Sequence, residues 1–97
     1  MNAEQRLSVL ADEIAACRRE LAVLDEQIEF QRDVSGEASL RALVSETPLN
    51  DREADEAGRD LARIERVRAE VADRLAHLNA EVDRVLDAAS GSRDRPG

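Results

Sequence analysis

The stretch LSVLADEIAACRRELAVLDEQI, residues 7–28, decides the fold of this chain. Its apolar residues alternate strictly between spacings of three and four, at Leu7, Leu10, Ile14, Cys17, Leu21, Leu24 and Ile28. Such spacing places side chains along one edge of an α-helix, at the a and d positions of a heptad repeat. Alanines and long unbranched side chains, which favour helices, fill the positions between. We therefore predict a helix over residues 3–34 with a coiled-coil seam.

A second heptad series follows later in the chain, with Arg68 as its one charged member. Its members are Ala54, Ala57, Leu61, Ile64, Arg68, Val71, Leu75, Leu78, Val82, Val85 and Ala89. This rhythm predicts a second helix over residues 49–89 that packs antiparallel on the first. We expect Leu7 to lie level with Val85. In that register Arg6 approaches Glu81, and Glu13 approaches Arg74.

The segment between the two series carries turn signals. Ser35-Gly36 predicts the end of the first helix, because glycine in a helix interior costs about 1 kcal/mol relative to alanine. Leu40, Leu43 and Val44 then have the spacing of a short amphipathic helix over residues 37–46. Pro48 suits the first turn of the second helix. Asn50, with Glu53 three residues later, has the form of a capping box, so the second helix is expected to begin between Pro48 and Asp51.

The expected fold is therefore all-α: an antiparallel two-helix coiled-coil hairpin with a short helix near the tip. It forms one unit over residues 1–89, and the composition of residues 90–97, SGSRDRPG, predicts a disordered tail. The segment from Leu40 to Leu49 has two interpretations, either a hairpin tip that closes the end of the seam or a recognition knob.

The layout resembles the small helical-hairpin coiled-coil proteins of actinobacteria. The resemblance rests on the heptads from Leu7 to Ile28, the linker RALVSETPL at residues 41–49, and the heptads from Leu61 to Val85. It implies a fold and brings no activity or site residue with it. The helical-hairpin anti-sigma factors that bind cyclic di-GMP are a poorer match. Glu4 and Ser8 fit the start of their motif, but Ala11 stands where an arginine is required.

Composition excludes several kinds of partner. The 97 residues include 22 acids and 14 arginines, no lysine and one aromatic ring, and the net charge is −8. This balance disfavours nucleic acids and anionic membranes as partners, because both require a basic face. No apolar run approaches the roughly 20 residues that cross a bilayer. The first residues lack the pattern of a signal peptide, and a lone cysteine agrees with a reducing compartment, so we expect a cytoplasmic location.

No residue pattern in the sequence indicates an enzyme, a metal site or a cofactor. His77 is the only histidine and falls outside the seam, which predicts an exposed surface residue. Cys17 falls in the seam among aliphatic neighbours, which predicts a buried, unreactive thiol. The carboxylates occupy heptad positions that face solvent. A two-helix rod also offers no concave pocket for a substrate.

Two seam positions are polar, Arg68 and Gln31. Arg68 has three possible roles: its stem lies along the apolar stripe with the head in solvent, or it fixes the helix register, or it binds an acid from a partner. Gln31 is explained more simply, since it comes near the expected end of the first helix.

A second apolar stripe runs along the first helix, at Val9, Ala16, Val23 and Phe30, each seven residues from the next. These c positions lie roughly 130° around the helix from the seam, so the second helix cannot cover both stripes. An exposed apolar row usually marks a contact surface. We therefore expect it to bind a second copy, as a dimer or a four-helix bundle, or another helical protein.

The function favoured by the sequence is noncatalytic protein–protein interaction, as a self-associating scaffold or adaptor. The alternative is a cytoplasmic regulator, similar in role to an anti-sigma factor, that captures a basic partner through its acidic surface. Salt separates the two, because electrostatic capture weakens as ionic strength rises whereas apolar association persists.

Overall fold

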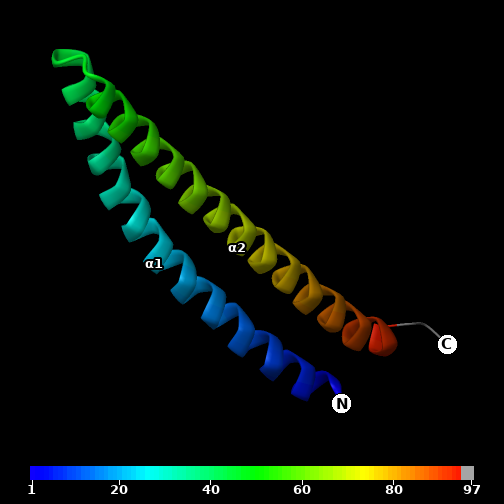
Figure 1. The fold of residues 1–97 in the computed structure, drawn as a ribbon. Helices are drawn as coiled ribbons and strands as arrows, with labels where there is room; N and C mark the ends of the chain where they lie inside the picture. Colours follow the sequence, from blue (N-terminus) through cyan, green and yellow to red (C-terminus); the bar gives the residue numbers. More distant parts are fainter. Residues whose placement is uncertain (95–97) are drawn as a thin grey trace.

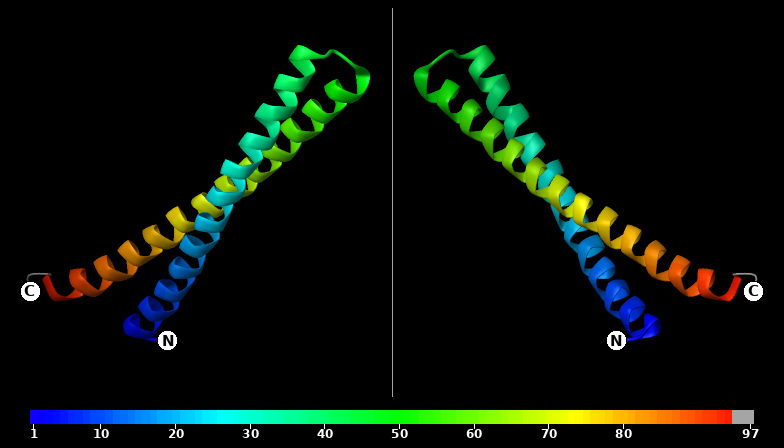
Figure 2. Two further views of the ribbon diagram at one scale, coloured as in Figure 1. Left: turned by 90° about the vertical axis from the view of Figure 1, so that its left-hand side faces the viewer. Right: turned by 90° about the vertical axis from the view of Figure 1, so that its right-hand side faces the viewer.

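The computed structural model describes residues 1–94 as two long helices joined by a short turn. Helix α1 spans Ala3–Val44 and α2 spans Pro48–Asp94. The helices run antiparallel, with both termini at one end of the rod and the turn at the other (Figure 1). The rod measures 77 × 21 × 15 Å, and the helices cross near their midpoints (Figure 2). The predicted all-α antiparallel hairpin is confirmed.

Capping groups begin both helices. The side chain of Asn2 accepts a hydrogen bond from the Gln5 backbone N–H at 2.8 Å, and the Gln5 side chain accepts one from the Asn2 N–H at 3.0 Å. At α2 the hydroxyl of Thr47 accepts from the Asn50 N–H at 3.1 Å. The capping box expected at Asn50 and Glu53 is therefore wrong, because Thr47 caps the helix. Pro48, at the first helical position, needs no N–H partner.

The separate short helix predicted over residues 37–46 is also wrong, because α1 continues without a break through Ser35 and Gly36 to Val44. The heptad rhythm explains the continuity, since counting on in sevens places Ser35, Ala38 and Ala42 in the seam. Ala38 is buried against α2. Gly36 lies on the outer side of the helix. The destabilisation of about 1 kcal/mol that glycine causes in a helix is outweighed by the backbone hydrogen bonds of the helical turns that follow it.

The core is a single seam between α1 and α2. Its most buried members are Cys17, Leu24, Ile28, Ala38, Ala57, Val71 and Val85. Cys17, Leu24 and Val71 pack together near the middle, with Leu21, Ile64, Leu75 and Leu78 around them. Every α2 position of the predicted series is buried or half-buried except Ala89, which is exposed.

Ion pairs along the rim of the seam agree with the predicted register in one case and correct it in another. Arg6 reaches Glu81, with Nη2 and Oε1 2.5 Å apart, as expected. The pair expected between Glu13 and Arg74 is wrong, because Arg74 pairs with Glu20 at 3.6 Å. Rim pairs contribute only about 0–1 kcal/mol each, which is too little to fix a register. The partner of Arg74 therefore depends on which nearby acid its side chain reaches.

The C-terminal boundary lies beyond the predicted one. Helix α2 continues to Asp94, so residues 90–94 are helical where a disordered tail was expected. Each residue added to an existing helix gains a backbone hydrogen bond, which favours such extension. The rest of the predicted tail, residues 95–97, lies outside the described residues.

Candidate interaction surfaces

The c stripe of α1, defined as Val9, Ala16, Val23 and Phe30, lies on the surface of the hairpin. Val9 is 44% exposed, Val23 53% and Phe30 68%, and Ala16 is also exposed. Helix α2 covers the other apolar edge of α1, the seam, where Leu24 and Ile28 are buried. The only aromatic ring of the chain is therefore outside the core.

Mostly polar residues border the c stripe. On one side the f positions carry Asp12, Arg19, Glu26 and Asp33, which form no ion pair within the described residues. On the other side the g positions carry Glu13, Glu20, Gln27 and Val34. An apolar centre beside a charged rim is the usual anatomy of a protein interface.

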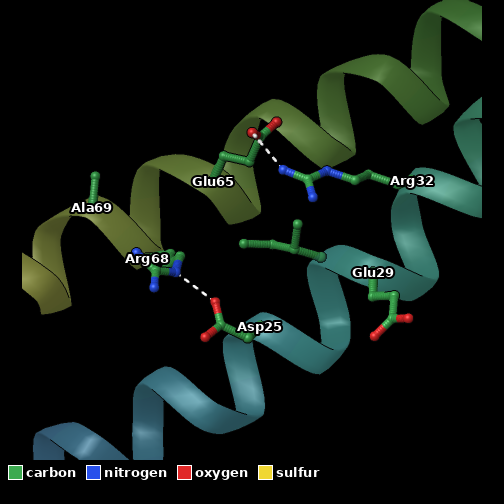
Figure 3. A pocket seen from close by; sticks show the side chains of 7 residues that line it. Asp25, Glu29, Arg32, Glu65, Arg68 and Ala69 are labelled. Atoms are coloured by element: carbon green, nitrogen blue, oxygen red, sulfur yellow. Dashed lines mark hydrogen bonds and ion pairs between the residues drawn. The ribbon is translucent and has the colours of Figure 1, made fainter.

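Arg68 leaves the seam toward solvent and meets an acid of its own chain. Its Nε lies 2.5 Å from Oδ1 of Asp25 on α1 (Figure 3). The hydrogen bond from Arg68 lowers the pKa of Asp25, and the positive charges of Arg68 and Arg32 lower it further. In turn, the hydrogen bond to Asp25 and the negative charge of Asp25 raise the pKa of Arg68. The arrangement agrees with an arginine stem along the seam and a head at its edge.

Gln31 and Arg32 make two further polar contacts across the hairpin. The Gln31 side-chain amide donates a hydrogen bond to the Ala57 carbonyl on α2 at 3.3 Å, and Arg32 pairs with Glu65 at 3.9 Å. Gln31 lies inside α1 and not near its end, so its placement is explained by this cross-helix bond.

The pairs of Arg32 and Arg68 border a surface cleft, shown in Figure 3. The cleft is lined by Asp25, Ile28, Glu29, Arg32, Glu65, Arg68 and Ala69. Its two arginines each pair with an acid of the other helix, Arg68 with Asp25 and Arg32 with Glu65. The cleft is therefore bordered by ion pairs between α1 and α2.

The two other residues considered for chemistry are placed as the sequence predicts. Cys17 is a free thiol and is buried in the core cluster. His77 is exposed, and its Nδ1 lies 2.8 Å from the Asp73 carbonyl oxygen one turn earlier. Among the side chains that the structure describes, no three histidine, cysteine or acidic residues gather closely enough to hold a metal ion.

The tip carries an exposed apolar surface within the segment Leu40 to Leu49, for which the sequence left two interpretations open. We define the tip patch as Leu40, Leu43, Val44 and Leu49, all of which are exposed. The spacing of the first three indicates an apolar helix face, and the hairpin leaves that face open to solvent. The signal that locates them correctly is the heptad phase, since counting in sevens from Leu7 places Ala42 in the seam and Leu40 and Leu43 outside it.

Comparison with known proteins adds no relative. No family model, curated protein or solved structure matches the chain. Among the described residues, neither helix has a stretch both long enough and apolar enough to cross a bilayer. Function must therefore be inferred from the surfaces that the hairpin leaves open.

Proposed function

We propose that this protein is a noncatalytic interaction module that associates with a second copy of itself through the c stripe of α1. The observation that supports the proposal is the outward placement of the stripe on a helix whose other apolar edge is already covered by α2. Each copy carries the same stripe, so two copies related by a twofold axis bury both stripes at once.

The small size of the hairpin core also supports this proposal. One seam between two helices is a narrow core, and a core of this size rarely supplies more than about 3–5 kcal/mol. Packing two hairpins side by side produces a four-helix bundle, in which each α1 is covered on two edges. Self-association therefore adds apolar burial that a single hairpin lacks.

The identity of the stripe residues agrees with an interface. Aromatic side chains are enriched at protein interfaces and frequently dominate their binding energy. Here the single aromatic ring, Phe30, is 68% exposed in an isolated chain. The buried free thiol of Cys17 agrees with a reducing compartment, and we infer a cytoplasmic location from it.

The experiment replaces the two most exposed stripe residues together, as Val23→Glu and Phe30→Glu, and measures mass by sedimentation. We expect at least 100-fold weaker self-association, because a charge buried at an interface without a partner costs several kcal/mol. Circular dichroism is expected to show unchanged helicity, since both positions are exposed in the single chain.

The matched control is the double variant Val67→Glu and Leu86→Glu on α2. It changes the charge by the same amount at two exposed apolar positions away from the stripe. The control is expected to keep the mass of the unmodified protein. Equal loss of association in both double variants, or no loss in either, would overturn the assignment of the c stripe.

A further inference from the structure

Apart from Met1, the two most exposed large apolar side chains of the described residues belong to the tip patch. Leu43 is 76% exposed and Val44 79%, and Leu40 and Leu49 are each exposed by more than half. A shallow hollow with an almost wholly apolar lining opens beside them, bordered by Leu40, Arg41, Val44, Ser45 and Asn50. Apolar side chains gathered at one end of a highly charged rod require a specific explanation.

Hydrogen bonds hold the turn beneath this patch in one shape. The Asn50 side-chain amide donates to the Ser45 carbonyl at 2.7 Å, and the Ser45 N–H donates to the Arg41 carbonyl at 2.9 Å. Arg41 of α1 also pairs with Glu53 of α2 at 3.9 Å. A surface that is already ordered loses little conformational entropy when a partner binds.

The charge around the tip patch selects the kind of partner. Residues 37–56 contain six acids and two arginines, a net charge of −4, which is half of the chain's total of −8 in about a fifth of its length. One of these arginines, Arg41, is already paired with Glu53. A second tip would be repelled by this charge, as would an anionic membrane or a nucleic acid.

We propose that the tip is a docking site for a basic amphipathic helix of another protein. Leucines, or residues of similar size, on one face of that helix contact Leu40, Leu43 and Val44. Lysines or arginines beside them face the acids at the rim of the patch, such as Glu37 and Glu46. Helices with apolar residues at spacings of three and four commonly bind apolar grooves in this way.

This docking site is separate from the proposed self-association surface. The c stripe ends at Phe30, and Leu40 lies ten residues further along α1, roughly 15 Å at the rise of an α-helix. The tip is also the end of the rod remote from both termini (Figure 1). Both surfaces can therefore be occupied at once, and each can be removed without the other.

The test is a fluorescence anisotropy titration with a labelled 18-residue synthetic peptide that has leucines on one helical face and lysines on the other. We expect binding to the unmodified protein, and at least tenfold weaker binding to the double variant Leu40→Ser and Leu43→Ser. The control variant Val67→Ser and Leu86→Ser is expected to bind as tightly as the unmodified protein. If the tip variant loses helicity, Val44→Ser with Leu49→Ser replaces it.

A second arm tests the charge. Replacing Glu37 and Glu46 with glutamine is expected to weaken peptide binding severalfold and to reduce its dependence on salt. The proposal is overturned if the peptide does not bind, if tip and control variants bind it equally, or if a scrambled peptide of the same composition binds as well. It is also overturned if the tip variant changes the protein's own mass in solution, or if the tip binds vesicles of neutral phosphatidylcholine in preference to the peptide.

Discussion

Truncation of Leu24 to alanine is expected to remove much of the stability of the hairpin, whereas the same truncation at Leu43 leaves it nearly unchanged. Both leucines lie on α1, and leucine and alanine are both strong helix formers, so helix propensity changes little in either variant. The two differ in burial, since Leu24 is 9% exposed in the core cluster and Leu43 is 76% exposed at the tip. The pair therefore isolates the contribution of the seam.

The expected magnitudes follow from burial. Leucine to alanine removes three carbons, each contributing about 0.8 kcal/mol when buried, so Leu24→Ala loses roughly 2 kcal/mol of transfer free energy. The cavity left between Cys17 and Val71 raises the loss to roughly 2–4 kcal/mol. Leu43 has only a quarter of its surface buried, so the same reasoning gives about 0.6 kcal/mol or less.

Thermal unfolding followed by circular dichroism at one fixed concentration measures both changes. For a chain of this size each kcal/mol shifts Tm by about 4–8 °C, so Leu24→Ala is expected to lower Tm by about 10–30 °C. Leu43→Ala is expected to lower it by less than about 5 °C. Comparable losses at the two positions would refute the reasoning, because they would place Leu43 in a packed interface within the hairpin.

Three further predictions concern single residues. Gly36→Ala should raise stability by about 0.5–1 kcal/mol, because α1 is continuous there and open space surrounds the added Cβ; a lower Tm would contradict a helical Gly36. Because Arg68 lowers the pKa of Asp25, their pair should stabilise the fold above pH 3.8 and lose that effect as pH falls through the folded-state pKa. In the variant Arg68→Gln, the pKa of the Asp25 carboxyl measured by NMR titration should therefore rise toward 3.8. An unchanged titration curve would show that the pair does not form. Cys17 should react with a thiol reagent far more slowly in the native protein than in urea, and equal rates would contradict its burial.

The seam was predictable from sequence because its signal is redundant. Heptads on both sides of the turn agree with one antiparallel register, and the pair between Arg6 and Glu81 forms where that register places it. Individual turn signals were less reliable. The cost of one glycine at position 36 is local, whereas the burial of Ala38 and the bonds of the following turns favour one continuous helix.

The tip patch shows why a local pattern was insufficient. The spacing of Leu40, Leu43 and Val44 identifies an apolar face but not the direction in which it points. That direction is set by the phase of the whole helix, which the small residues Ser35, Ala38 and Ala42 continue without a large apolar side chain among them. Small seam residues are easily mistaken for the absence of a seam.

The most direct measurement of the central claim is sedimentation equilibrium of the unmodified protein over a series of concentrations. Because every copy carries the exposed c stripe of α1, we expect the mass to rise above the 10.7 kDa of a single chain and to reach that of a dimer or a larger assembly. The mass should stay raised at high salt, because apolar contacts are not screened. A mass that stays at 10.7 kDa at every concentration would contradict the account.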